Sequence, residues 1–347
     1  MKKKILWQFF TKQEIAWNLI DLILSKFKLN SISNILEPSS WTKSFVNELN
    51  KRWFKNIKEY EIDWNLTKNP KNFLETIIKE KFNLIIWNPP YSKIHSKETF
   101  VIYKWKRMKI EQAFILKSLN LLSNDWWFWF ILPINFFTNN KNIKNLILSK
   151  FNTIYIYQDD TPWFNENINS AFIFCHNSNN PWINLIYKEI FTHKINKDEF
   201  IEKALPVYYF NKNKYKDISN IKLWNFIKKV SKSVNINYKN KNLSSKELVN
   251  RKININDWDN YSIAIARVWM WIVWKCGLIN SKDIINEVFY VYELKKEYSS
   301  HKNAILIQEY IRKNRQYFLD ISIWTWSPSI GNKDILDLPI NIEIKWS

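Results

Sequence analysis

Glycine is nearly absent from this chain, which has 2 glycines and 20 tryptophans in 347 residues. An average usage of about 7% predicts roughly 24 glycines in this length, and the two counts together come close to that number. Tryptophan also stands in turns, as at Trp41 after Pro-Ser-Ser and at Trp126 and Trp127 after Asn-Asp. We infer that most of these tryptophans are UGA codons that the source organism reads as glycine. The alternative is a protein rich in tryptophan, and a mass spectrum of a native peptide with Trp87 would establish it.

Cysteine and long apolar runs are also scarce. Cys175 and Cys276 lie far apart, and the 4 histidines have no ligand spacing, so the sequence predicts no metal site and a reduced, cytoplasmic protein. No apolar run approaches the length of a membrane span. The basic N-terminus continues into Gln8, Lys12 and Gln13, which is not a signal-peptide core. A membrane is therefore not an expected partner.

Positive charge, by contrast, is abundant. The formal net charge is +20, which favours a polyanionic partner such as nucleic acid. An AT-rich genome would enrich lysine, asparagine and isoleucine without any selection for binding, so the charge leaves both interpretations open. The length suits about two domains, and 46% hydrophobic and 24% charged residues are typical of a globular protein.

The clearest motif follows a short apolar run. Leu84 to Trp87 leads directly into Asn88-Pro89-Pro90-Tyr91. An apolar run ended by prolines predicts a buried strand of a parallel sheet. Ligands of open α/β sheets bind at the carboxyl ends of strands. There the Asn88 side chain and the Pro89 carbonyl offer two acceptors for an NH2 group, and Tyr91 offers a ring for stacking. An ordinary strand-end turn is the alternative, since Asn-Pro is a common turn dipeptide.

Two earlier segments also predict polar groups at strand ends. Residues 35–36 predict a first strand, and the small polar turn 37–41 follows it; glycine at position 41 would let its backbone approach a ligand closely. Residues 57–63 predict a second strand that ends in acids. An acid in this place, one strand after a glycine-rich turn, binds ribose hydroxyls. Thr11 is a plausible N-cap for a helix whose apolar positions run from residue 15 to 23.

These motifs resemble those of γ-class DNA N6-adenine methyltransferases, which use S-adenosylmethionine, and the resemblance covers nearly the whole chain. It implies that the catalytic residues are Asn88, Pro89, Pro90 and Tyr91. It implies that the cofactor is bound by Phe10, Thr11, Glu37, Ser39, Trp41, Glu61, Ile62, Asn72 and Phe73. Two positions depart from the family pattern, because Lys43 replaces the second glycine of the first cofactor loop and Asn72 replaces an aspartate.

The resemblance also implies roles for individual residues. Phe10 would pack on the cofactor, Thr11 would bond its methionine end, and Glu37 would face its cationic amino group. Glu61 would bind the ribose, and Asn72 would accept a hydrogen bond from the adenine amino group. The expected partner is double-stranded DNA; whether a cognate restriction endonuclease exists stays open.

The implied architecture is a Rossmann-like α/β methyltransferase domain with a mainly parallel seven-stranded sheet over residues 1–178. A connecting region would follow over 179–245. Residues 246–347 resemble the α+β target-recognition domains of restriction-modification specificity subunits, with a strand, a hairpin and a second strand between 262 and 280 and a helix near 303–312. Arg267 and Lys275 are candidates for DNA contacts there; a solvated basic face is the alternative.

Two other functions remain open. Asn-Pro-Pro-Tyr also suits the side-chain amide of glutamine, which would make the protein a release-factor glutamine N5-methyltransferase. Those enzymes carry a helical domain before the first cofactor loop, whereas here this loop begins near residue 35. A non-catalytic DNA specificity module is the other alternative, and failure to bind S-adenosylmethionine would favour it.

Overall fold

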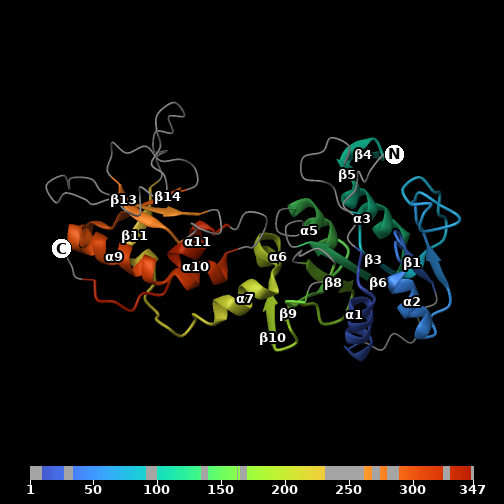
Figure 1. Ribbon diagram of the computed structural model, residues 1–347, viewed down its shortest axis with the longest axis horizontal. Coiled ribbons are helices and arrows are strands. Elements are labelled where there is room, and N and C mark those ends of the chain that lie inside the picture. Colours follow the sequence, from blue (N-terminus) through green and yellow to red (C-terminus); the bar gives the residue numbers. More distant parts are fainter. Residues whose placement is uncertain are drawn as a thin grey trace. The chain divides into compact units, whose positions relative to one another are not determined.

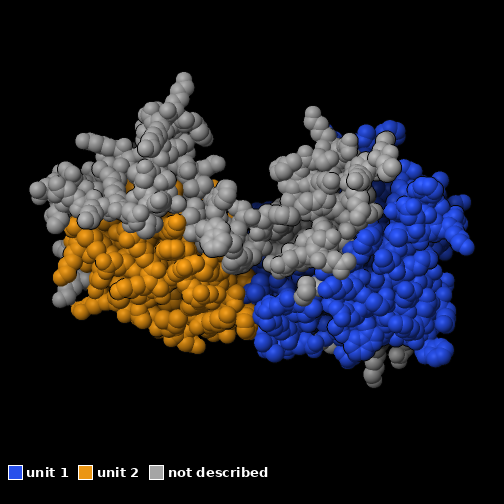
Figure 2. Space-filling view, viewed as in Figure 1, with its two compact units in different colours: residues 1–207 blue, residues 208–347 orange. Residues whose placement is uncertain are grey.

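The computed structural model describes most of the chain (Figure 1). The described residues are 10–26, 34–90, 100–133, 140–161, 163–164, 170–230, 262–267, 274–279, 289–322 and 329–344. They belong to two compact units, residues 1–207 and 208–347 (Figure 2). No described helix is long and apolar enough to cross a membrane.

The first unit is an α/β structure around an eight-stranded sheet with the order β10-β9-β7-β8-β6-β3-β1-β2. Strands β2, β1, β3 and β6 run parallel to one another, whereas β8 runs antiparallel to both β6 and β7. The strands are β1 (Ile35–Glu37), β2 (Ile57–Glu59), β3 (Phe82–Trp87), β6 (Leu122–Pro133), β7 (Thr153–Gln158), β8 (Ser170–His176), β9 (Ile183–Tyr187) and β10 (Phe191–Ile195).

Helices and a hairpin complete this unit. The helices are α1 (Gln13–Lys26), α2 (Ser44–Lys51), α3 (Ile110–Leu121), α5 (Lys141–Leu148) and α6 (Lys197–Lys203), and β4 (Phe100–Tyr103) pairs with β5 (Lys106–Lys109). Helix α7 (Pro206–Asn213) begins at the end of this unit, and from residue 208 on it belongs to the second unit. Helices α1 and α2 pack side by side (Figure 1). The apolar run that predicted a buried strand is central in the sheet, since Leu84, Ile85 and Ile86 of β3 are fully buried.

The sheet differs from the expected one in extent. It has eight strands rather than seven, because β9 and β10 add a hairpin at its edge. Residues 179–207, expected to connect two domains, therefore belong to the first compact unit. The expectation was wrong there because an Asn- and Lys-rich segment hides the strand Ile183–Tyr187, all of whose residues are buried.

The second unit combines an antiparallel sheet with helices. Its four-stranded sheet has the order β11-β14-β12-β13, made of β11 (Ile227–Lys229), β12 (Ser262–Ala266), β13 (Cys276–Ile279) and β14 (Phe289–Leu294). The helices are α9 (His301–Lys313), α10 (Arg315–Ile321) and α11 (Asn332–Leu336), with short 3-10 helices at Leu223–Asn225 and Lys296–Tyr298. The predicted strand pair between 262 and 280 and the predicted helix near 303–312 are confirmed.

Candidate active site

The candidate site lies where two adjacent strands end. Strands β1 and β3 are parallel neighbours, so the segments that follow them, 37–41 and 88–90, meet at one edge of the sheet. The Ser39 hydroxyl donates a hydrogen bond of 3.0 Å to the backbone carbonyl of Asn88. Pro89 and Pro90 are buried beside it, whereas Tyr91 lies outside the described residues. The structure thus brings together a predicted catalytic segment and a predicted cofactor segment.

The segment before α1 joins the same place. The side-chain amide nitrogen of Asn88 donates to the Thr11 hydroxyl over 3.1 Å, and both side chains are buried. This contact sets the orientation of the Asn88 amide, because its nitrogen faces Thr11. The Ser44 hydroxyl at the start of α2 donates to the Thr11 carbonyl over 2.7 Å. Thr11 is therefore fixed between Asn88 and the start of α2.

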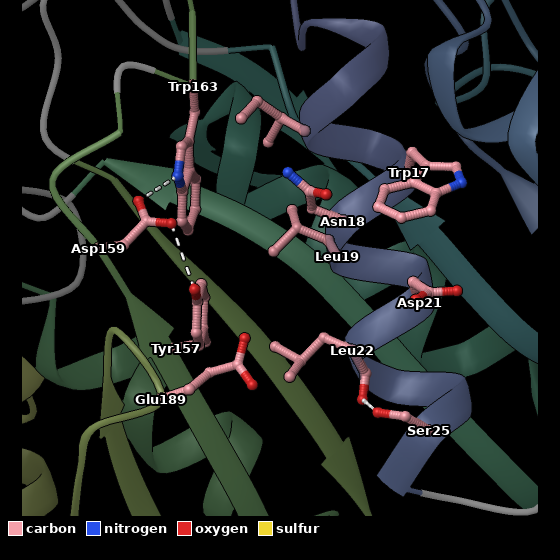
Figure 3. Close-up of a pocket in the computed structure, with 11 residues that line it drawn as sticks. Trp17, Asn18, Leu19, Asp21, Leu22, Ser25, Tyr157, Asp159, Trp163 and Glu189 are labelled. Atoms are coloured by element: carbon pink, nitrogen blue, oxygen red, sulfur yellow. Dashed lines mark hydrogen bonds between the residues drawn. The ribbon is translucent and has the colours of Figure 1, made fainter.

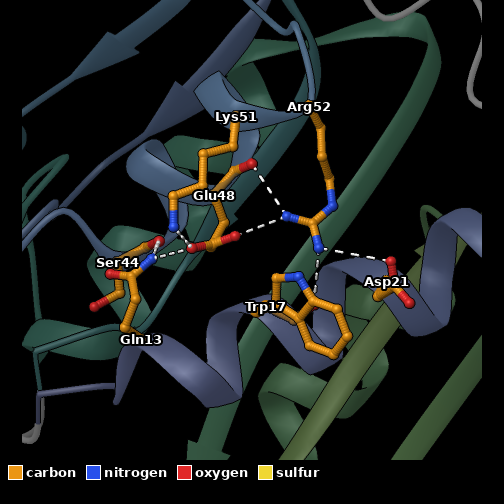
Figure 4. A network of polar contacts seen from close by, with 7 residues as sticks. All are labelled: Gln13, Trp17, Asp21, Ser44, Glu48, Lys51 and Arg52. Atoms are coloured by element: carbon orange, nitrogen blue, oxygen red, sulfur yellow. Dashed lines mark hydrogen bonds and ion pairs between the residues drawn. The ribbon is translucent and has the colours of Figure 1, made fainter.

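A buried polar network keeps α1 and α2 in register (Figure 4). At its centre, the Glu48 carboxylate accepts hydrogen bonds from Gln13 at 2.6 Å and from Arg52 at 2.8 Å, and it forms an ion pair with Lys51. Burial alone would raise the pKa of Glu48, but hydrogen bonds from Lys51, Gln13 and Arg52 outweigh it and lower the pKa. Gln13 also donates to the Ser44 carbonyl, so the network supports the residue that fixes Thr11.

Glu37 ends β1 with a carboxyl group that is 2% exposed. Within the described part of the chain its Oε2 atom has no hydrogen-bond partner. Burial raises the pKa of this carboxyl well above its usual value, and the carboxylates of Glu59 and Glu61 raise it further. A buried carboxyl oxygen without a partner is costly, even though the carboxyl also has a hydrogen bond from the Val46 backbone. The surroundings of Glu37 therefore suit a cationic ligand group, which would complete its hydrogen bonding.

Glu61 follows β2 and is held by the backbone. Its Oε2 atom accepts from the Trp41 backbone N–H at 2.7 Å, and its Oε1 atom accepts from the Asp63 N–H at 2.8 Å. The acid at this strand end is thus tied to the turn that follows β1, as expected for two parts of one ligand site. Ile62, predicted to touch the cofactor as well, is 58% exposed.

The segment around Asn72 and Phe73 is held by a residue that sequence reasoning missed. Asn72 Oδ1 accepts from the Leu74 N–H at 3.0 Å, which closes a local turn, and the Phe73 ring is buried. Lys117 of α3 donates through its ammonium to the carbonyl oxygens of Phe73, Leu74 and Thr76. The signal in the sequence is a lysine between the apolar residues Phe114 and Leu119 of the segment that forms α3.

A pocket of about 390 Å³ opens elsewhere in the first unit, between α1 and the end of β7 (Figure 3). None of the predicted site residues lines it. Its wall includes the Trp163 indole, which is buried, donates to Asp159 over 2.7 Å and lies parallel to the Tyr157 ring. Trp163 is thus a tryptophan whose N–H group and ring both have partners.

The two predicted DNA-contact residues belong to the second unit and are half-buried. The Arg267 guanidinium lies 5.3 Å from the centre of the Tyr290 ring, and the Lys229 ammonium lies 4.8 Å from the same ring. The Lys275 carbonyl accepts from the Ala266 N–H in the β12–β13 pair. Arg267, Lys229 and Tyr290 therefore form a basic, aromatic cluster on this sheet.

Comparison with known proteins identifies the first part of the chain. Residues 11–164 match the family described as Eco57I restriction-modification methylase. The type II methyltransferase M.HincII of Haemophilus influenzae is 31% identical over 160 residues, which cover 42% of this chain and 31% of that protein. M.AccI of Acinetobacter calcoaceticus is 26% identical over 205 residues, covering 50% and 37%. The chain thus spans about a third of the length of these curated relatives.

A solved structure with a similar chain is the methyltransferase subunit of a type I restriction-modification system from Streptococcus thermophilus. It has 18% sequence identity and a TM-score of 0.40, and it covers 64% of this chain and 55% of its own. The matched family confirms the sequence resemblance to restriction-modification methylases for residues 11–164. The C-terminal segment with Arg267 and Lys275 lies outside that match.

Proposed function

We propose that this protein is a DNA adenine-N6 methyltransferase of a restriction-modification system. The observation that carries the proposal is the meeting of Thr11, Ser39 and Asn88 through direct hydrogen bonds at the ends of β1 and β3. Residues separated by up to 77 positions in the sequence form one buried polar group, and Ser39 in this group follows Glu37 by two residues. Relatives named as type II methyltransferases over the same segment support the assignment.

S-adenosylmethionine is the cofactor in this proposal, and when bound it supplies a methyl group on a cationic sulfonium. Glu37 would bind the ammonium of its methionine part, because that group supplies the donors and the positive charge that the buried carboxyl lacks. Glu61, fixed by two backbone N–H groups, would bind the ribose hydroxyls. Phe10, Thr11, Ser39, Asn72 and Phe73 would complete the site, with Ile62 at its rim.

The acceptor of the methyl group would be the amino group of an adenine. The target base lies inside a duplex, so it must be flipped out to reach the site. The Asn88 side-chain carbonyl and the Pro89 carbonyl would accept hydrogen bonds from its NH2 group, which directs the nitrogen lone pair away from the ring. Tyr91 would stack on the base. In this scheme the protein contributes mainly by positioning, and Thr11 keeps the Asn88 amide in the required orientation.

DNA would be contacted by the second unit. The cluster of Arg267, Lys229 and Tyr290 combines two cations with an aromatic ring, a combination suited to phosphates and bases. Lys275 is a further candidate on the neighbouring strand. In this proposal residues 246–347 act as the target-recognition domain for double-stranded DNA, and whether a cognate restriction endonuclease acts on the same DNA site stays open.

Methylation of DNA by the Asn88→Ala variant tests the proposal. The parent for this comparison carries glycine at position 41, because the Trp41 indole bonds Ser39 and the Asn88 carbonyl in the candidate site. It should leave N6-methyladenine in host DNA, and Asn88→Ala should reduce these marks at least about 100-fold, because removing one well-placed transition-state contact costs that much. Asn180→Ala, an exposed asparagine outside the site, is the matched control and should keep full activity.

The same assay separates the alternatives. Methylation of a glutamine in a release factor, with unmodified DNA, would replace the proposal by protein methylation. DNA binding without any binding of S-adenosylmethionine would indicate a specificity module. Undiminished DNA methylation by Asn88→Ala would contradict the role given to Asn88.

A further inference from the structure

Three tryptophans have a backbone conformation that favours glycine. Trp41, Trp53 and Trp105 have φ angles of 46°, 71° and 65°, and they are three of the seven non-glycine residues with positive φ in the described ranges. Both printed glycines have negative φ. A side chain in this left-handed region costs roughly 1–2 kcal/mol for ordinary residues, and only glycine adopts it freely. The conformation reserved for glycine is thus taken by tryptophan.

The side chains of two of these residues offer little that would offset the strain, although the Lys55 ammonium lies 5.6 Å from the centre of the Trp53 ring. Trp53 is 83% exposed and Trp105 is 98% exposed. An exposed indole gains little from burial, so no packing explains why a bulky residue stands in a left-handed turn. Each position suits glycine better than the residue written there.

Two other tryptophans are buried but lack a hydrogen-bond acceptor for the indole N–H group. Trp87 and Trp129 are fully buried in β3 and β6, and their indole Nε1 atoms have no hydrogen-bond partner among the described residues. A buried N–H group without an acceptor costs about 1–3 kcal/mol. Trp163, by contrast, has both an acceptor and a stacked ring.

Trp41 is the position where this pattern meets the candidate site. Its indole is 8% exposed and donates through Nε1 to the Ser39 hydroxyl at 3.1 Å and to the Asn88 carbonyl at 3.0 Å. The Phe10 ring meets it edge-on, with ring centres 5.6 Å apart. The indole therefore fills the space among three residues that would bind the cofactor or the target base, and it contributes to the burial of Asn88.

We propose that positions 41, 53 and 105 are glycine in the functional protein, and that the indole written at position 41 closes the cofactor pocket. The identity of the excluded ligand, S-adenosylmethionine, rests on the proposed function. Glycine at 41 would keep the backbone N–H that donates to Glu61, because that contact needs no side chain. It would release Ser39 and the Asn88 carbonyl from the indole and open the space between Phe10 and the strand ends.

Calorimetric titration with S-adenosylmethionine tests the closed pocket. The chain as written should bind weakly or not at all, and Trp41→Gly should bind at least tenfold more tightly. Trp163→Gly is the matched control. It removes an indole of the same size from the same unit and should lower the Tm without any gain in binding, because Trp163 has both a hydrogen-bond and a stacking partner. An equal gain in affinity for S-adenosylmethionine in Trp41→Gly and Trp163→Gly would contradict the proposal that the indole at position 41 closes the pocket.

A second measurement does not depend on any ligand. Trp53→Gly and Trp105→Gly should each raise the Tm by about 2–4 °C, the shift expected for roughly 1 kcal/mol in a protein of this size. Trp64→Gly changes an exposed tryptophan that has no positive φ and should not raise the Tm. A fall in the Tm of both Trp53→Gly and Trp105→Gly would contradict the glycine assignment.

Mass spectrometry of the native protein separates this inference from the proposed function. Native peptides with glycine at 41, 53 and 105 uphold it, and tryptophan at these positions overturns it. Native glycine at 41, together with no binding by Trp41→Gly, would leave the glycine assignment standing and would reject S-adenosylmethionine as the ligand.

Discussion

The two units use buried acids in different ways. In the first unit, Glu37 is buried at the end of a parallel strand, and one of its oxygen atoms has no partner among the described residues. In the second unit, Asp334 is equally buried, but its carboxylate accepts from the Tyr208 hydroxyl at 2.5 Å. The backbone carbonyl of Asp334 also accepts from the Tyr317 hydroxyl at 2.7 Å.

This difference separates a ligand site from a structural contact. A buried acid with a partner within its own unit holds elements together, here α7, α10 and α11. A buried carboxyl oxygen that lacks a partner can gain one when a ligand binds. The comparison therefore assigns binding to the strand ends of the first unit and stability to the Asp334 cluster of the second. Variants of Glu37 and Asp334 test this difference, and a variant of Arg267 tests the DNA contacts of the second unit.

The largest expected effect is on cofactor affinity in Glu37→Gln. In a parent with glycine at position 41, this change should weaken binding of S-adenosylmethionine by about 10–100-fold, because it removes a charge-assisted contact of about 1.5–3 kcal/mol. The Tm of the ligand-free protein should rise at neutral pH, since a buried carboxyl with one unpaired oxygen is replaced by a neutral group. Titration calorimetry measures the affinity, which should fall, and thermal unfolding measures the Tm, which should rise.

Glu37 also predicts a pH dependence with a definite sign. Burial raises its pKa, so the folded protein keeps this proton at pH values where the unfolded chain, with a pKa near 4.5, has lost it. The stability contributed by Glu37 is therefore present below about pH 4.5 and is lost as the pH rises through the raised pKa. Binding of a cation should tighten over the same interval. If Glu37→Gln kept this pH dependence of binding, Glu37 would not be the titrating group.

The site was predictable where it follows a strand end. The apolar run before Asn88 and the short run before Glu37 predicted two strands of a parallel sheet, and the carboxyl ends of such strands meet at one edge. That these two strands are neighbours came from the structure. The proximity of Thr11 to Asn88 followed only from the family resemblance, because no local pattern joins residues 77 positions apart. The role of Trp41 in the site came from the same resemblance, together with the low glycine count.

Long-range support for the site could not be predicted. Lys117 bonds three carbonyl oxygens about 40 residues before it, and Glu48 gathers partners from two helices. Such partners depend on how elements pack rather than on periodicity within one element. The β9–β10 hairpin was missed for a different reason, since a polar composition around residues 177–195 concealed a short buried strand. The fold class was therefore easier to predict than the extent of the sheet.

A smaller effect, on stability alone, is expected for Asp334→Ala in the second unit. The change leaves the buried Tyr208 hydroxyl without its acceptor, which should cost about 1–3 kcal/mol in the free energy of unfolding. Denaturant unfolding measures the loss, and the exposed Asp217→Ala is the control. Cofactor affinity of the folded protein should not change. If Asp334→Ala weakened cofactor binding as much as Glu37→Gln, Asp334 would not be a purely structural acid, and the two units would not differ in the way proposed.

The smallest expected effect is on DNA affinity in Arg267→Ala. Arg267 and Lys229 lie against the Tyr290 ring, so removal of the guanidinium should weaken DNA binding by about fivefold, or roughly 1 kcal/mol, and should reduce the dependence of log K on log salt by about 1. Binding of S-adenosylmethionine should stay the same. Fluorescence anisotropy of a labelled duplex at several salt concentrations measures both quantities.

Lys228→Ala is the matched control for this variant. Lys228 and Lys229 are neighbours on β11, so their side chains point to opposite faces of the sheet, and Lys228 pairs with Glu293 at 3.8 Å instead of approaching Tyr290. If DNA binds the face that carries Tyr290, Lys229→Ala should resemble Arg267→Ala and Lys228→Ala should resemble the parent. Equal losses for both lysines would mean that the charge of the chain, rather than this cluster, attracts the DNA.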